Sequence, residues 1–138
     1  MNPDDSEINS LRPLSDLQPS QLYVNRKKLE ELQSNINFNQ PENIPPIPIK
    51  RLDGEWVMTD GHTRAYAAFL AGLELVPTEP DEDALDWEAY RICVDWCKNA
   101  GITQISALKG RVIDPDAYDR LWLARCKRMQ DCLKAKRH

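Results

Sequence analysis

The spacing of apolar residues in the first part of the chain predicts an amphipathic helix. Leu29, Leu32 and Ile36 recur at intervals that place them on one face of a helix. Asn25 precedes this stretch, and asparagine is a favoured cap for the first turn of a helix. We therefore expect a helix from Arg26 to about Ile36, with its charged residues facing water.

A β-hairpin is predicted next along the chain. Its two strands are expected at Ile47–Leu52 and Glu55–Thr59, separated only by Asp53 and Gly54. Asp-Gly is a preferred pair for a tight turn because the central residues of that turn need a positive φ. Pro48 has no N–H for a ladder hydrogen bond, so the first strand is expected to be an edge strand or an irregular one.

Three short elements are predicted on either side of the hairpin. We expect a strand at Leu11–Leu14, an Ala-rich helix at Ala65–Ala71 that Gly72 ends, and a strand at Leu75–Pro77. Helices and strands mixed in this order, with no regular βαβ repeat, predict a compact α+β module over residues 11–80.

The pattern becomes helical after Ala84. A helix is predicted to begin there and to end at Gly101, followed by a connector over residues 102–113 that contains a short helical or extended piece. The apolar positions of this helix are Leu85, Ala89, Ile92, Cys93 and Trp96.

A last helix is predicted from Pro115 to about Ala135. Asp114 caps it in this prediction, and proline fits the first helical position at no cost in hydrogen bonds. Residues 84–138 are thus expected to form a C-terminal helical extension packed on the first domain. The stripe expected to enter the core is Tyr118, Leu121, Trp122 and Met129.

Charge and composition narrow the classes of function. The net charge of −4 argues against a general binder of nucleic acids, because such binding rests on many Lys and Arg contacts to phosphates. The basic C-terminal residues are expected to form a solvated helix face, with DNA contact possible but not favoured. They are Lys127, Arg128, Lys134, Lys136 and Arg137.

The location of the protein is expected to be the cytoplasm. No apolar run approaches the length of a membrane span, and residues 1–10 are acidic, polar and expected to be disordered. Cysteines in that compartment are normally reduced thiols. Buried or half-buried thiols are favoured over a zinc site for Cys93, Cys97, Cys126 and Cys132.

Candidate chemistry gathers in Asp60-Gly61-His62-Thr63-Arg64, between the hairpin and the Ala-rich helix. The start of a helix has unpaired N–H groups and a partial positive charge, and a glycine there lets an anion approach the backbone. Arg64 and His62 can add charge and donors, while Asp60 can hold a metal ion or take a proton. Capping by Asp60 and Thr63, with an Asp60–Arg64 ion pair, is the alternative; we favour a ligand site.

Residues along half the chain resemble the partition-protein B (ParB)/sulfiredoxin superfamily, which implies a small mixed sheet with helices. The residues that carry the resemblance are Leu14-Ser15-Asp16-Leu17-Gln18-Pro19-Ser20, Lys28-Leu29-Glu30-Glu31-Leu32, Ile47-Pro48-Ile49, Asp60-Gly61-His62-Thr63-Arg64-Ala65-Tyr66-Ala67-Ala68 and Leu70-Ala71-Gly72. Sulfiredoxins carry Gly-Gly-Cys-His-Arg; with the arginine aligned on Arg64, His62 replaces their nucleophilic cysteine, so that activity is not expected. Partition proteins carry Gly-Glu-Arg-Arg, which binds a cytidine nucleotide.

The motif most resembles the free serine kinase branch, whose small proteins phosphorylate L-serine with a nucleotide donor and magnesium. The resemblance implies Mg²⁺ with ADP, ATP or CTP and a small hydroxyl-bearing metabolite as ligands. It assigns catalysis to Asp60 and His62, metal binding to Asp60, and phosphate binding to Gly61, Thr63 and Arg64.

A second acid is expected, because one carboxylate cannot serve well as both metal ligand and general base. Its candidates are Glu30, Glu31 and Glu79. The chain departs from serine-kinase-like relatives at Asn25-Arg26-Lys27-Lys28, where acids are expected. The alternative is therefore a noncatalytic ParB-like nucleotide-sensing or DNA-associated module, with a homodimer possible in either case.

Overall fold

The structure, a computed structural model, describes residues 10–138. The predicted disorder of residues 1–10 concerns residues outside this range, with the exception of Ser10. Ser10 begins the first strand, so the predicted boundary is wrong at that residue.

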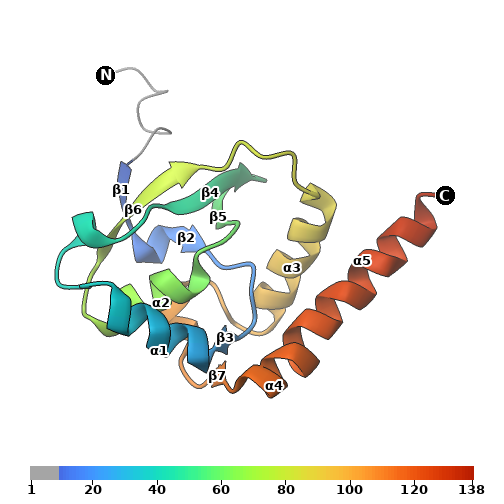
Figure 1. Cartoon of the computed structure of the whole chain (residues 1–138). Coiled ribbons are helices and arrows are strands. Elements are labelled where there is room, and N and C mark those ends of the chain that lie inside the picture. The colour runs from blue at the N-terminus through green and yellow to red at the C-terminus, as the bar shows by residue number, and fades with distance from the viewer. Residues whose placement is uncertain (1–9) are drawn as a thin grey trace.

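The strands form a five-stranded sheet in the order β1-β6-β4-β5-β2 and a two-stranded sheet of β3 and β7 (Figure 1). Their bounds are β1 Ser10–Pro13, β2 Leu17–Gln18, β3 Val24–Asn25, β4 Ile47–Leu52, β5 Glu55–Met58, β6 Leu75–Pro80 and β7 Val112–Ile113. The larger sheet is mixed, because β1–β6 and β4–β5 are antiparallel whereas β4–β6 and β2–β5 are parallel. β6 continues beyond the predicted end at Pro77 because it pairs on both sides, with β1 and β4.

The helices confirm the predicted α+β class with a helical C-terminal part. Their bounds are α1 Arg26–Asn35, α2 His62–Leu70, α3 Trp87–Asn99, α4 Pro115–Tyr118 and α5 Ala124–Lys136. In Figure 1, α1 and α2 lie together below the larger sheet, while α3 and α5 lie to its side. Over residues 10–138, no helix has both the length and the apolar character needed to cross a membrane.

The hairpin forms as predicted, but its first strand is not at an edge. Asp53 and Gly54 have φ values of 51° and 82°, as the tight turn requires. β4 lies inside the sheet, between β6 and β5. Thr59 N donates to Pro48 O (3.1 Å), but Pro48 has no N–H to donate to Thr59 O in return. The Tyr90 hydroxyl donates to Thr59 O instead (3.0 Å), which explains why Pro48 is tolerated inside the sheet.

The predicted helix ends are confirmed for α1 and partly for α3. Asn25 Oδ1 accepts hydrogen bonds from the first-turn N–H groups of α1. α3 begins at Trp87 rather than near Ala84, because the carboxylate of Asp86 caps it by accepting from Ala89 N (3.2 Å). Gly101, with a φ of 78°, ends the helical segment as predicted.

The last helical segment contains a π-helical turn, Asp119–Leu123, between α4 and α5. The wider turn changes which residues face the core, so Trp122 is buried while Leu121 is 44% exposed. The prediction that Leu121 enters the core is therefore wrong. The helix begins at Pro115 with Asp114 in the N-cap position, as predicted, but the carboxylate of Asp114 caps no N–H group. It accepts a hydrogen bond from the side chain of Arg26, the first residue of α1, instead.

The main hydrophobic cluster draws on both parts of the chain. Leu17, Val24 and Met58 pack in one cluster with residues from beyond α3. The predicted connector 102–113 supplies three of its most buried side chains, and it contains the 3-10 turn Ile105–Leu108 as well as β7. These side chains are Ile102, Ile105 and Leu108.

The cysteines are free thiols in different environments. Cys93 and Cys97 are buried and Cys126 is half-buried, whereas Cys132 is exposed, contrary to the prediction for that residue. Burial raises the pKa of Cys97 to about 12. Within the described residues, no three His, Cys, Asp or Glu side chains gather as a metal site.

Candidate functional site

The candidate motif forms the sharp turn between β5 and α2. Gly61 adopts a φ of 75°, and α2 begins at the next residue, His62, earlier than the predicted start at Ala65. A Cβ at Gly61 would lie 2.9 Å from Nη2 of Arg64, because the guanidinium folds back over the glycine. Gly61 is therefore required for its left-handed backbone and for the close approach of Arg64.

The first turn of α2 has no side-chain cap within residues 10–138. Asp60 Oδ1 accepts a hydrogen bond from Gly61 N (2.8 Å), and Arg64 Nη1 donates to the carbonyl oxygens of Pro45 (3.2 Å) and Pro46 (3.0 Å). The alternative in which Asp60 and Thr63 cap the helix and Arg64 pairs with Asp60 is therefore wrong. The partial positive charge of the uncapped helix end remains available to an anion.

All five motif residues line one pocket of about 370 Å³. Its opposite wall comes from α1, from which Lys28 and Glu31 face the motif. The other lining residues are Gln21, Leu32, Asn35 and Tyr118. Of the acids proposed as a second carboxylate, Glu31 lies in the pocket, whereas Glu30 and Glu79 do not line it.

Lys28 is the main residue that the prediction of the site missed. It belongs to the basic stretch that departs from the serine-kinase pattern, yet it lines the pocket together with Arg64. The signal was present in the sequence: Lys28, Glu31 and Asn35 are spaced so that they share one face of α1.

His62 is buried and neutral rather than charged. Its Nε2 accepts a hydrogen bond from Ser20 N (2.9 Å), and only 3% of the residue is exposed. Burial lowers the pKa of His62 to about 4, although the carboxylate of Asp60 opposes this shift. The expectation that His62 adds positive charge is thus wrong at neutral pH.

The proton of the neutral imidazole lies on Nδ1, because Nε2 is the acceptor. Nδ1 is buried, and no atom of residues 10–138 accepts a hydrogen bond from it. A buried donor without a partner is costly, so this atom marks a place where a ligand atom would gain a hydrogen bond.

The pocket therefore combines two cations with two carboxylates. Lys28 and Arg64 can bind phosphate oxygens beside the helix start, with the Thr63 hydroxyl as a further donor. Asp60 and Glu31 fit a magnesium ion that is held by one or two carboxylates and otherwise by phosphate oxygens and water. Such a donor set suits the ion because Mg²⁺ rarely uses a cage made only of protein atoms.

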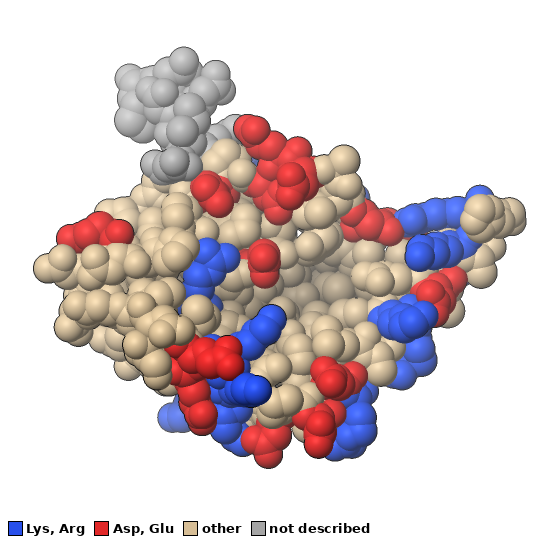
Figure 2. Space-filling model, in the orientation of Figure 1, with Lys and Arg blue, Asp and Glu red and all other residues tan. Residues whose placement is uncertain are grey.

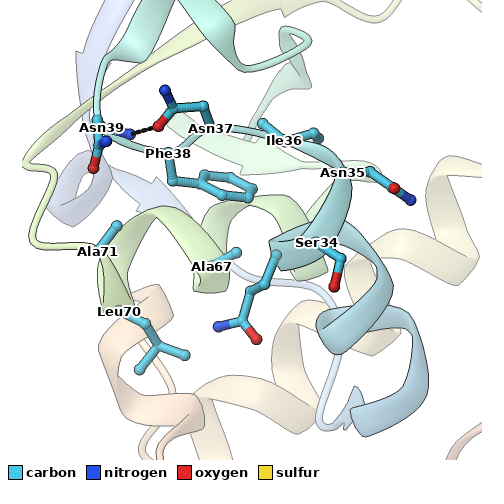
Figure 3. A pocket seen from close by; sticks show the side chains of 10 residues that line it. Ser34, Asn35, Ile36, Asn37, Phe38, Asn39, Ala67, Leu70 and Ala71 are labelled. Atoms are coloured by element: carbon cyan, nitrogen blue, oxygen red, sulfur yellow. Dashed lines mark hydrogen bonds between the residues drawn. The ribbon is translucent and has the colours of Figure 1, made fainter.

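A separate groove, of about 600 Å³, lies between the end of α1 and the C-terminal half of α2, away from the motif (Figure 3). Its described lining consists of apolar and uncharged polar residues, including Asn35, Asn37 and Asn39. Asn37 Oδ1 accepts from Asn39 N (3.0 Å), the contact drawn in Figure 3. This groove offers no titratable side chain among the described residues, so the motif pocket is the better candidate for chemistry.

Comparisons with known proteins give likenesses among solved structures only. No family model matches the sequence, and no curated protein is significantly similar to it. The C-terminally truncated chromosome-partitioning protein ParB from Caulobacter crescentus, complexed with CTP-gamma-S, shares 25% identity over 66% of this chain with a TM-score of 0.45. The chain is similar to a partition protein.

Protein Atu1540 from Agrobacterium tumefaciens is also similar, with 17% identity over 77% of this chain and a TM-score of 0.48. The present chain spans 52% of the length of the ParB chain and 61% of Atu1540.

Proposed function

We propose that the chain is a ParB-like nucleotide-binding module that holds nucleotide phosphates at the start of α2. The observation that carries the proposal is the uncapped helix start in one pocket with Lys28 and Arg64. Backbone N–H groups and two cations converge on one place, and nothing in residues 10–138 neutralises either cation with a carboxylate.

Magnesium belongs to the same proposal. Asp60 has one carboxylate oxygen on Gly61 N, which leaves the other for a metal ion, and Glu31 lies in the same pocket. Asp60 and Glu31 would hold a magnesium ion there, and its charge would offset the repulsion between these carboxylates and the phosphates. ADP, ATP and CTP are the nucleotides to test.

Equilibrium titration with each magnesium nucleotide tests this binding. Lys28→Ala is expected to weaken binding about tenfold, since it removes a charge-assisted contact to phosphate. Lys27→Ala is the matched control, because Lys27 is the exposed neighbouring lysine that does not line the pocket. Equal affinities of the two variants would place the phosphates elsewhere.

Phosphoryl transfer to a serine-like hydroxyl is the second candidate, favoured by the presence of Glu31 in the pocket. Two carboxylates allow one to bind magnesium while the other takes the proton of the acceptor hydroxyl. His62 would not act as the base in this scheme, because its Nε2 is held by Ser20 N. It can only donate from Nδ1.

An assay for phosphoserine from L-serine, magnesium and ADP or ATP separates the two candidates. Transfer predicts product with the wild type and with Glu30→Gln, whose carboxylate does not line the pocket, and loss of product with Glu31→Gln. If nucleotide binds but no variant forms phosphoserine, the module is not a serine kinase and the binding function stands alone.

A further inference from the structure

A second cavity, of about 340 Å³, adjoins the phosphate pocket through His62 and Gln21, which line both. Its walls come mainly from α3 and the last helical segment, including Tyr90, Trp122 and Met129. Figure 2 shows the face of the molecule hollowed near its middle, with mostly uncharged residues in the hollow and charged groups around it. The two cavities therefore share the wall that these two residues form.

Most polar groups that line the second cavity already make hydrogen bonds within the protein. The Ser20 hydroxyl donates to Met58 O (2.7 Å), and the Tyr90 hydroxyl donates to Thr59 O (3.0 Å). Asp86, the only carboxylate among the described lining residues, accepts hydrogen bonds from Nη1 and Nη2 of Arg137, each at 3.0 Å. A charged ligand would lose its hydration there without finding a free partner.

The groups that remain suit an uncharged aromatic ring. Trp122 and Met129 supply apolar surface for the faces of a ring, and thioethers pack well against aromatic rings. Gln21 uses Nε2 to donate to Tyr23 O (2.8 Å), which leaves its carbonyl oxygen as an acceptor. The amide of Gln130, also in the lining, can both donate and accept along the edge of a heterocycle.

His62 belongs to the wall that the two cavities share. It lines both cavities, and its buried Nδ1 is a donor without a partner in the described chain. A ligand that spans the cavities would pass this nitrogen, and a sugar hydroxyl or ring oxygen there would satisfy it.

Resting on the proposed function, we propose that the nucleoside of the bound nucleotide occupies the cavity between α3 and the last helical segment, while its phosphates lie at the start of α2. The base stacks against Trp122 and Met129, and the sugar accepts a hydrogen bond from His62 Nδ1. The C-terminal helical segment is thus a wall of the ligand site.

Two probes separate the parts of this site: magnesium tripolyphosphate, which has no nucleoside, and the magnesium nucleoside triphosphates ATP and CTP. The full chain is expected to bind at least one nucleotide about tenfold more tightly than tripolyphosphate. Met129→Trp, which fills the cavity, is expected to remove this difference without changing the affinity for tripolyphosphate. Leu123→Trp is the matched control, because Leu123 lies on the same helical segment, is 48% exposed and does not line the cavity.

Gln130→Ala provides a second variant, because Gln130 is exposed and its truncation cannot unfold the core. It is expected to lower the affinity for the preferred nucleotide alone. Equal affinity of the wild type for tripolyphosphate and both nucleotides would overturn the nucleoside site and leave the phosphate site standing. If neither probe binds, the proposed function fails, and the nucleoside site fails with it.

Discussion

Gly61 meets two requirements of the phosphate pocket, and each can be tested against a second glycine. Gly61 and Gly72 both have a positive φ, 75° and 86°, but only Gly61 has Arg64 close to the position of a Cβ. Alanine at either position is expected to lower the free energy of unfolding by about 1 kcal/mol. Gly61→Ala should also displace the guanidinium and weaken nucleotide binding, whereas Gly72→Ala should leave the affinity unchanged.

Urea unfolding and calorimetric titration measure these two effects separately. If Gly61→Ala binds nucleotide as well as Gly72→Ala does, the position of Arg64 over the glycine has no role in binding. The motif at these residues was predictable from the sequence, because its signals are local. The neutrality of His62 was not, since it depends on burial by distant segments such as the one that contains Ser20.

His62 is expected to make the free energy of unfolding depend on pH. Its pKa is about 4 in the folded protein and near 6.5 in the unfolded chain, so the unfolded state takes up the proton first as pH falls. The neutral ring adds roughly 3 kcal/mol to the free energy of unfolding above pH 6.5. This contribution is lost as the pH falls from about 6.5 to about 4. His62→Gln should lack this loss.

Denaturant unfolding of the wild type and His62→Gln at pH 7 and pH 4 measures the difference. Carboxylates titrate in both proteins, so comparing the two isolates the histidine. A wild-type loss no larger than that of His62→Gln would show that His62 is not held neutral in the folded state.

Among the elements, β4 depends on a side-chain hydrogen bond from α3. Tyr90 donates to Thr59 O, opposite the position where Pro48 lacks an N–H. Burial, with Asp81 and Asp60 nearby, raises the pKa of Tyr90 to about 12, so the hydroxyl stays protonated. Tyr90→Phe is therefore expected to lower the free energy of unfolding by about 1 kcal/mol, since Thr59 O loses its partner.

A double-mutant cycle checks this cause. In a Pro48→Ala background the alanine N–H can donate to Thr59 O, so the cost of Tyr90→Phe should become smaller. An unchanged cost in that background would mean that the Tyr90 hydroxyl does not replace the ladder hydrogen bond.

Elements with local signals were predictable and those set by tertiary packing were not. The Asn25 cap and the Asp-Gly turn act within a few residues, and both form as the sequence predicts. The position of β4 inside the sheet depends on β6, which pairs with it from a distant part of the sequence. The π-helical turn at Asp119–Leu123 likewise has no local signal, yet it decides that Trp122 rather than Leu121 is buried.

For the whole molecule, one hydrophobic cluster joins the two predicted parts of the chain. The sequence predicted 102–113 as a connector because its apolar residues follow neither a helical nor a strand period over any length. Ile105 and Leu108 are nevertheless buried, since they pack beneath α2. We propose that residues 11–80 and 84–138 fold as one cooperative unit rather than as a domain with an extension.

In the proposed function, nucleotide phosphates bind at the start of α2 beside Arg64. Thermal unfolding with ADP, ATP or CTP, with and without magnesium, tests it most directly on the wild type, Arg64→Ala and Arg91→Ala. Arg91 is the control because it is exposed and pairs with Asp53 outside the pocket. A ligand at 100 times its Kd adds about 2.7 kcal/mol to the stability of the folded state.

A rise in melting temperature with at least one magnesium nucleotide is predicted for the wild type and for Arg91→Ala, but not for Arg64→Ala. Phosphate binding at this site is contradicted if no nucleotide raises the melting temperature of the wild type, or if the melting temperature of Arg64→Ala rises as much as that of Arg91→Ala.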